Sequence, residues 1–599
     1  MHVEESAGSE NSVTLPNEKD GVAGAPGASE HLQAITAVVR VGTDNYYEKD
    51  EPRTYGDGED HNHEPPVFSQ ILQIQDLRLT MVLDDSPPNH VSYCYGCGVP
   101  PYIYGDIGGV DRWVWLVLAN LLALAAVCPF VGALSDLFGR RYVALSGAGF
   151  VVIGMIICAT AYKMNIFIAG MAIAGVGAGI NELTALAVTS ELAPTAKRGK
   201  YVAVLVFTIL PFCPAVLWAQ LIAYHSSWRW IGLICAVWAF IGLLLTAFFY
   251  FPPPRVNNSS LSRREVLARV DWAGGILSIG GMILFIAGLL WGGYQYAWTD
   301  VHTLVPLLIG VALLVAFFFW ELYGAKYPMF PRRLAKEPRT LALTLVITFI
   351  SGANFFSVIL FWPTQAFNVY GHDPIGVGIR GFPVGFGILV GACIVLWLLS
   401  VFRGGNRMLM IISSVTMTAG CGAMAAATRY NLNAVYGILI IAGLGIGGIV
   451  IPASIITTII CPDDLIGTVA ALTLAIRVIG GAIGYTTYYN VFFNKLVPIL
   501  TENIGFACVQ NGIYNASDIR EIIGLTGTSL VEAILFHPAV NGNVTKYENL
   551  VLAGELAYAA AYPWVYYTSI AFGGVSVIAA FFLGDINKYM DDHVAVVLH

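Results

Sequence analysis

Thirteen apolar runs, each about 20 residues long, constrain what this chain of 599 residues can fold into. Such a run is long enough to cross the hydrocarbon core of a bilayer as an α-helix. The composition, 56% hydrophobic and 12% charged, argues against a soluble multidomain protein of this length. The sequence therefore predicts an all-α polytopic membrane protein with 13 clear spans. The runs begin near Trp113, Tyr142, Ile166, Tyr201, Trp230, Ala273, Thr303, Leu341, Gly381, Met408, Ala434, Leu465 and Tyr562.

The first 65 residues differ from the rest of the chain. They hold much of the acid behind the net charge of −8, and they contain no apolar run. This composition predicts a disordered, acidic tail in water. The N-terminus also has neither the basic start nor the apolar stretch of a cleavable signal peptide, so we expect the first membrane helix to direct insertion.

Lysine and arginine concentrate in alternate connections between the apolar runs. Cytoplasmic loops of membrane proteins carry an excess of these two residues. We therefore place the basic connections in the cytoplasm, and we expect the long connection at 495–561 to face outward. The basic set is Arg140, Arg141; Lys197, Arg198, Lys200; Arg255, Arg263, Arg264, Arg269; Lys326, Arg332, Arg333, Lys336, Arg339; and Arg403, Arg407.

Two Asn-x-Ser/Thr sequons fall in the outward connection, at Asn515 and Asn543. Their position fits exposure to a glycosylating compartment and predicts a glycoprotein. A further match at Asn257 and Asn258 lies on the cytoplasmic side by charge, so we interpret it as chance.

Cysteines and histidines do not form a recognisable metal pattern. Cys94 and Cys97 have the spacing of metal ligands or of a redox pair, but no second pair accompanies them, so coincidence is the favoured interpretation. The run from Asp60 to Glu64 lies in the acidic tail and is interpreted as solvated. We expect no metal and no cofactor.

The connection GALSDLFGRRY, between the first two clear runs, packs an acid, two arginines and two glycines between apolar segments. It resembles the signature of the major facilitator superfamily, the cytoplasmic connection between the second and third helices. Other stretches extend the likeness to the fungal trichothecene efflux pump group, within the fourteen-helix drug:proton antiporters: DIGGVDRWVW, SELAPTAKRGKY, SSWRWIG, DWAGG and IRVIGGAIG. The signature positions are Gly132, Asp136, Gly139, Arg140 and Arg141.

The resemblance implies two six-helix bundles with two further helices inserted between them. It divides the chain into a cytoplasmic tail at 1–65, a degenerate first-helix region at 66–104, an N-terminal bundle at 105–251, a segment of cytoplasmic loops and the inserted pair at 252–340, a C-terminal bundle at 341–583 that includes the outward loop 495–561, and a cytoplasmic tail at 584–599.

The family's first helix is missing or degenerate in this sequence. The region before residue 105 holds Asp76 and Arg78, which at a helix centre would cost on the order of 5–7 kcal/mol to insert. Its apolar stripe suits a helix lying in the membrane interface. Either an exon boundary was misassigned, or this is a divergent and impaired variant.

The resemblance also suggests a role for the signature connection. Asp136 is expected near the N-terminus of the helix that begins near Leu465, where the positive end of the helix dipole favours a carboxylate. Arg140 or Arg141 is expected to pair with Glu191, forming a latch that closes only with the cytoplasmic side. The alternative for the arginines is that they only anchor topology.

Two charged residues lie well inside apolar runs, Glu182 and Arg477. An ionisable group inside a membrane is by default a functional hypothesis. Glu182 either carries the transported proton or is a neutral packing residue. Arg477 is expected to face the interior, where it either binds an anionic substrate group or pairs with an acid or a carbonyl. Met171 stands where related antiporters have an arginine, which puts coupling by that residue in doubt.

The resemblance implies a proton-coupled exporter of amphipathic small molecules, such as a mycotoxin or xenobiotic, in the plasma or vacuolar membrane of a fungus. A siderophore–iron uptake transporter and a non-transporting sensor or impaired transporter remain alternatives. No hydrolase, metalloprotease or nucleotide-binding motif is present, so we do not expect an enzyme. The expected partners are a small-molecule substrate, protons and lipid, without nucleic acid, and the expected state is a monomer.

Overall fold

The structure is a computed structural model that describes residues 99–109, 112, 115–251, 265, 269–292, 296–331, 333–334 and 336–591. The chain divides into two units, 1–66 and 67–599, and every described residue belongs to the second. The predictions for the acidic tail, the first-helix region before residue 99, Cys94 and Cys97, the sequon at Asn257 and residues 592–599 lie outside the described residues.

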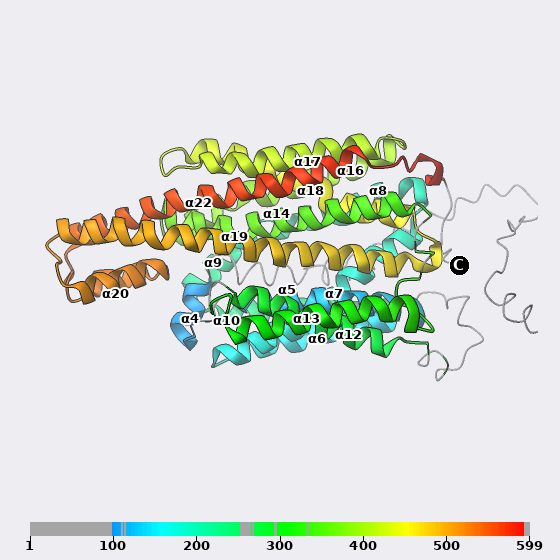
Figure 1. Ribbon diagram of the computed structural model, residues 1–599, viewed down its shortest axis with the longest axis horizontal. Coiled ribbons are helices and arrows are strands. Elements are labelled where there is room, and N and C mark those ends of the chain that lie inside the picture. The colour runs from blue at the N-terminus through cyan, green and yellow to red at the C-terminus, as the bar shows by residue number, and fades with distance from the viewer. Residues whose placement is uncertain are drawn as a thin grey trace, which may run out of the picture. The chain divides into compact units, whose positions relative to one another are not determined.

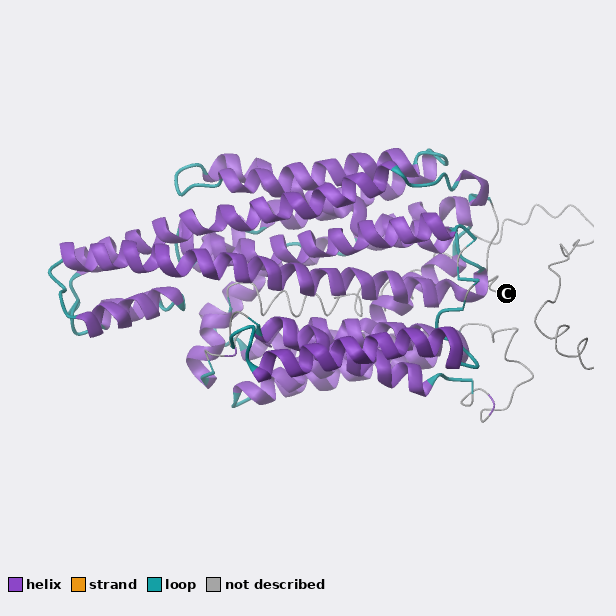
Figure 2. Cartoon of the chain, in the orientation of Figure 1, coloured by secondary structure: helices purple, strands orange, loops and turns teal. Residues whose placement is uncertain are grey.

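Within the described residues the secondary structure is helical, with no strand (Figure 2). The predicted all-α fold class is confirmed. The N-terminal group consists of α4 (Pro100–Ile107), α5 (Trp115–Phe138), α6 (Arg140–Ala159), α7 (Met164–Leu192), α8 (Arg198–Phe207), α9 (Ala215–His225) and α10 (Arg229–Phe249). The inserted pair is α12 (Trp272–Trp291) and α13 (Val301–Phe319). The C-terminal group consists of α14 (Pro338–Tyr370), α15 (Pro374–Arg380), α16 (Phe382–Val401), α17 (Asn406–Ala423), α18 (Leu432–Ile459), α19 (Ile466–Gln510), α20 (Ala516–Gly527), α21 (Val531–Phe536) and α22 (Val544–Phe581).

Twelve of the described helices are long and apolar enough to cross a membrane, one fewer than the thirteen runs counted in the sequence. The difference comes from the run that begins near Tyr201. It is split into α8 and α9 by a 3₁₀ turn at Leu210–Phe212. Pro211 and Pro214 cause the break, because proline lacks the backbone N–H and clashes with the preceding turn. The two pieces have 10 and 11 residues, each too short to span alone.

In Figure 1 α5, α6, α7 and α10 lie in one layer with the inserted pair, and α14, α16, α17, α18, α19 and α22 lie in the other, while α8 and α9 pack mainly on helices of the C-terminal group. In the N-terminal group α6 and α5 both pack on α7, and in the C-terminal group α18 packs on α16 and α17 while α14 packs on α19. The inserted helices α12 and α13 pack on each other, and α12 also packs on α5. Several helix pairs join the groups: α5 and α7 both pack on α19, α8 packs on α16 and touches α18, and α9 packs on α15.

Small residues let the helices approach closely. A Cβ atom added at Gly175 of α7 would lie 2.3 Å from the Asn120 carbonyl oxygen of α5. One added at Gly177 would lie 2.4 Å from the Gly147 carbonyl oxygen of α6. Contacts this short exclude any larger residue at these positions, so the glycines of α7 serve helix packing.

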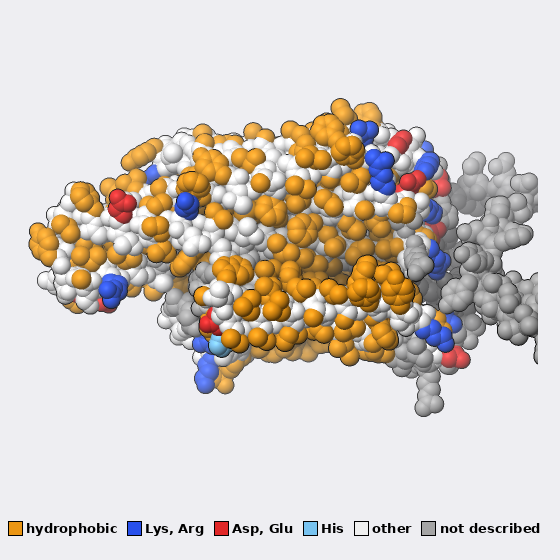
Figure 3. Space-filling view, in the orientation of Figure 1, with side chains coloured by type: hydrophobic (Ala, Val, Ile, Leu, Met, Phe, Trp, Pro, Cys, Tyr) orange, Lys and Arg blue, Asp and Glu red, His pale blue; other side chains and the backbone are white. Residues whose placement is uncertain are grey.

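Hydrophobic side chains cover most of the face seen in Figure 3, and Lys and Arg gather at the end where α12 and α14 begin. Ile276, Leu308 and Phe318 are examples of large apolar side chains exposed on the inserted pair. An apolar belt with basic residues at one end is the surface expected of a membrane protein whose basic loops lie in the cytoplasm.

The outward connection expected at 495–561 is mainly helical. At 1.5 Å per residue, α19 with its 45 residues is about 68 Å long, about twice the thickness of a bilayer core. The helix continues because Leu496, Leu500 and Ile504 recur at every fourth position and are buried together. The parts of α19 and α22 furthest from the basic end, with α20 and α21, therefore form a packed helical extension instead of a loop, which we call the outward extension after the side predicted by the basic connections.

Candidate functional site

Asp136, near the C-terminal end of α5, contacts the first turn of α19. Its Oδ2 accepts hydrogen bonds from the Thr468 backbone N–H at 2.9 Å and from the Thr468 hydroxyl at 2.7 Å. The first N–H groups of a helix have no partner within the helix and lie at the positive end of its dipole. The Asp136 carboxylate therefore caps a helix of the other bundle.

Arg140 completes this contact as a buried ionic network. Its guanidinium donates to Asp136 at 2.8 Å, to Glu191 at 2.5 Å and to the Ser135 hydroxyl at 2.5 Å. The Arg140 side chain is 3% exposed, so each buried charge needs these partners. We call Asp136, Arg140, Glu191 and Thr468 the latch.

Arg141 does not pair with Glu191. It donates to the Ala247 carbonyl in the last turn of α10 at 2.9 Å and lies over the Phe251 ring at 3.9 Å from its centre. A cation at a helix C-terminus is favoured by the dipole, so Arg141 joins α6 to α10 within one bundle. Of the two arginines, only Arg140 belongs to the latch.

The two signature glycines, Gly132 and Gly139, are required for different structural reasons. Gly132 faces α19, where an added Cβ atom would lie 2.4 Å from the Ala471 methyl group. Gly139 joins α5 to α6 with a φ of 88°, a conformation that side chains other than glycine rarely adopt. Gly467 was not singled out in the sequence. A Cβ atom there would lie 2.4 Å from Arg140 and 2.5 Å from Asp136.

Arg198 adds a second contact between the bundles on the same side, and sequence reasoning missed it. Its side chain is 1% exposed and donates to the Thr458 carbonyl oxygen at 2.7 Å, in the last turn of α18. A neighbouring contact joins the Lys200 backbone N–H to the Ser400 hydroxyl at 3.0 Å. In the sequence Arg198 is one of several basic residues in its connection. Its charge therefore predicted only that this connection lies in the cytoplasm.

Glu182 and Arg477 form an ion pair between α7 and α19, so Arg477 has the acid partner that was one of its two expected roles. Their side chains are 15% and 4% exposed. Arg477 also donates to the Val450 carbonyl oxygen of α18 at 3.2 Å. The pair therefore lies inside the membrane region and joins the two bundles.

Met171, in the position where an arginine was expected, is fully buried in α7. Its carbonyl oxygen accepts a hydrogen bond from the Asn120 amide at 3.2 Å. Met171 thus contributes packing and no charge.

Asn515 and Asn543 are exposed and cap helices of the outward extension. Their side-chain oxygens accept hydrogen bonds from the backbone N–H groups of Ser517 and Lys546, each at 3.1 Å. The caps use Oδ1 and leave Nδ2, the atom to which a glycan is attached, outside the capping bond. Elsewhere, no group of three His, Cys, Asp or Glu side chains among the described residues is arranged to hold a metal ion.

The sequence matches the protein family described as fungal trichothecene efflux pump (TRI12) over residues 96–599. It is 27% identical to the trichothecene efflux pump TRI12 of Fusarium sporotrichioides over 509 residues, 82% of this chain and 83% of that protein. It is 27% identical to the pump of the same name from Trichoderma arundinaceum, with the same coverage. It is 26% identical to the MFS-type transporter gkaD of Penicillium citrinum, over 81% of this chain and 80% of that one. Because the family match covers most of the chain and both helix bundles, this protein belongs to the fungal trichothecene efflux pump family of major facilitator transporters.

Proposed function

We propose that this protein exports amphipathic small molecules across a fungal membrane in exchange for protons. The relatives named as trichothecene efflux pumps suggest the solute class to test first. The observation that carries the proposed coupling is the Glu182–Arg477 ion pair, because it joins a titratable carboxylate of one bundle to a guanidinium of the other.

A stabilising role alone does not account for this pair. Replacing a buried ion pair by well-packed apolar residues is often neutral or stabilising, since both charges lose their hydration. An acid at a helix centre also costs about 2.5–3.5 kcal/mol on insertion scales. A charged pair retained at this depth is therefore better explained by a change of charge during the transport cycle.

Protonation of Glu182 provides that change. A proton that enters from the outward side neutralises the carboxylate and removes its attraction to Arg477, which keeps its hydrogen bond to Val450. The bundles then separate more easily. Release of the proton to the cytoplasm restores the carboxylate, and the pair re-forms as the cytoplasmic side closes.

The latch is proposed to hold the cytoplasmic side closed. Its bonds from Asp136 to Thr468 cross between the bundles, as does the bond from Arg198 to Thr458. Asp136 contacts the start of α19, and Arg198 contacts the end of α18. Opening toward the cytoplasm must break them, so they bias the equilibrium between the two states.

We further propose that the protein acts as a monomer in the plasma membrane or the vacuolar membrane and carries glycans at Asn515 and Asn543. Export across either membrane would remove a toxic solute from the cytoplasm. Fluorescence microscopy of the tagged protein in a fungal host would distinguish the two membranes.

A flux measurement tests the proposal. Inside-out vesicles from a transporter-depleted yeast that expresses the protein should accumulate a tritiated trichothecene when a proton gradient is imposed. A protonophore should abolish the accumulation. Uptake of an iron–siderophore complex without trichothecene flux would contradict export, and trichothecene binding without flux of any solute would indicate a sensor.

A further inference from the structure

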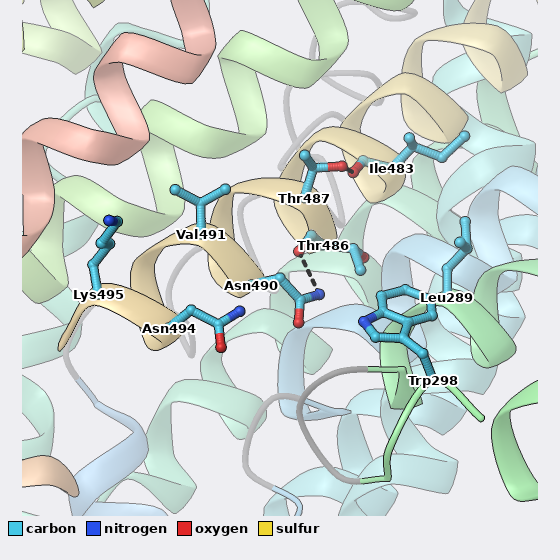
Figure 4. Close-up of a pocket in the computed structure, with 9 residues that line it drawn as sticks. All are labelled: Leu289, Trp298, Ile483, Thr486, Thr487, Asn490, Val491, Asn494 and Lys495. Atoms are coloured by element: carbon cyan, nitrogen blue, oxygen red, sulfur yellow. Dashed lines mark hydrogen bonds between the residues drawn. The ribbon is translucent and has the colours of Figure 1, made fainter. Parts of the chain in front are cut away.

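A cavity of about 420 Å³ lies between the inserted segment, at the end of α12 and the connection to α13, and the middle of α19 (Figure 4). This volume falls in the range of small-molecule sites. The cavity is lined by Leu289, Trp298, Ile483, Thr486, Thr487, Asn490, Val491, Asn494 and Lys495.

The cavity is separate from the Glu182–Arg477 pair. Its nearest lining residue on α19, Ile483, follows Arg477 by six residues, about 9 Å along the helix and about 240° around its axis, and Asn490 follows Arg477 by 13 residues, about 20 Å. The wall of the cavity that faces α19 is formed by Leu289 and Trp298 of the inserted segment. This segment packs against the N-terminal bundle through α12. The cavity thus lies at the outward end of the seam between the two bundles.

Its polar side is formed by Thr486, Thr487, Asn490 and Asn494 on one face of α19. The hydroxyl groups of Thr486 and Thr487 both donate to their own helix, to Ala482 and Ile483, at 2.8 Å. Their protons are therefore occupied, and their remaining lone pairs are available to accept. Together with the Asn494 amide, which can donate and accept, these oxygens suit ligands that carry hydroxyl groups.

Asn490 supplies the strongest indication that a ligand belongs here. Its amide nitrogen donates to the Thr486 carbonyl oxygen at 3.0 Å. Because that carbonyl can only accept, the orientation of the amide is fixed and its Oδ1 is the remaining polar atom. This oxygen is buried and has no hydrogen-bond partner among the described residues. A buried acceptor left without a donor costs about 1–3 kcal/mol, so a shift of the Asn490 side chain that brings Oδ1 against a ligand hydroxyl would be favourable.

The opposite wall is apolar. Leu289 presents aliphatic surface there and the Trp298 ring lies against Gly292, while Val491 adds aliphatic surface on α19 itself. Lys495 at the outer end is turned away and lies over the Trp564 ring, 4.1 Å from its centre. The cavity thus fits a neutral molecule with one apolar face and several hydroxyl groups.

We propose that this cavity is an outward release site for polyhydroxylated amphipathic solutes. The proposal rests on the export function proposed above. The acceptors from Thr486 to Asn494 extend about 12 Å along the helix, more than the single hydroxyl of a membrane sterol can use. Because its two walls follow different bundles, the site changes shape when the bundles move, which would let the solute leave.

The test uses a tritiated trichothecene with free hydroxyl groups, its fully acetylated derivative, and the full-length protein in nanodiscs. Thr487→Val and Asn490→Leu each remove one acceptor and should weaken binding of the hydroxylated probe about three- to tenfold. Binding of the acetylated probe should not change. Thr501→Val is the matched control, because this exposed threonine makes the same bond to its own helix outside the cavity.

A steric variant gives a second measurement. Leu289→Trp should fill the cavity and slow release of the hydroxylated probe from loaded vesicles, whereas Ile283→Trp, on the exposed side of the same helix, should not. A photoreactive form of the probe should label residues 483–495 of the wild-type protein.

Several results would overturn the release site. These are absence of labelling at 483–495, equal effects of Thr487→Val and Thr501→Val, and displacement of the probe from these residues by ergosterol. If trichothecene flux persists while these variants behave like their controls, the release site is wrong and export stands. If the probe labels the site but no solute is transported, export is wrong.

Discussion

Asp136→Asn isolates the charge of the latch, because asparagine keeps the size of aspartate and one side-chain oxygen. The carboxylate accepts two hydrogen bonds from Thr468 and one from Arg140. Hydrogen bonds to charged groups contribute about 1.5–3 kcal/mol and neutral ones about 0.5–1.5 kcal/mol. A partly buried charge at a helix terminus adds up to about 2 kcal/mol. We expect the closed state to lose about 2 kcal/mol, which is a shift of about 30-fold.

Double electron–electron resonance between spin labels at Tyr142→Cys and Met408→Cys measures this shift. Both positions are exposed near the cytoplasmic ends of the two bundles. If the closed state outnumbers the open state by about 100 to 1 in the parent, the ratio would fall to about 3 to 1 in the variant. The distance distribution would then contain a second, longer distance from the open state. Asp106→Asn is the control, because this aspartate pairs with Arg229 on the outward side. Identical distance distributions for Asp136→Asn and the parent would refute a latch that depends on charge.

Three further outcomes are expected. Gly467→Ala should open the same cytoplasmic distance, because its methyl group would lie 2.4 and 2.5 Å from two latch side chains; an unchanged distance would contradict this. Removing both sequons with Asn515→Gln and Asn543→Gln should abolish the gel shift caused by an N-glycosidase, and a shift that persists would place glycans elsewhere. The hydrogen bond from Arg229 lowers the pKa of Asp106. The Asp106–Arg229 pair should therefore stabilise the folded protein at pH values above 3.8, the ordinary pKa of this carboxyl group. That stabilisation should be lost as the pH falls through the lowered pKa. Thermal unfolding of wild type and Asp106→Asn should differ at neutral pH and converge in acid, and a difference that grows in acid would reverse the sign.

The sequence predicted the helical fold because each span carries its own signal. A run of apolar residues specifies a membrane helix without reference to the rest of the chain. The resemblance to the family signature predicted that Asp136 lies near the start of α19. In the structure the Asp136 carboxylate contacts that helix end.

What the sequence did not predict depends on how the bundles pack. Glu182 and Arg477 are 295 positions apart, and nothing local relates one to the other. Arg198 could not be told from the other basic residues of its loop, since its burial results from α8 packing on α16. The helical outward extension was missed because Lys495, Pro498 and Glu502 interrupt the apolar stretch in which Leu496, Leu500 and Ile504 recur at every fourth position.

The central claim is that Glu182 carries the coupling proton, and proton-driven transport by Glu182→Gln tests it most directly. Glutamine keeps the size of the side chain and can still bond to Arg477, but it does not titrate. In proteoliposomes we expect the variant to exchange tritiated trichothecene between the two sides at about the wild-type rate and to lose the accumulation driven by an imposed pH gradient. Accumulation by Glu182→Gln that still follows the gradient, and that a protonophore still abolishes, would contradict the account.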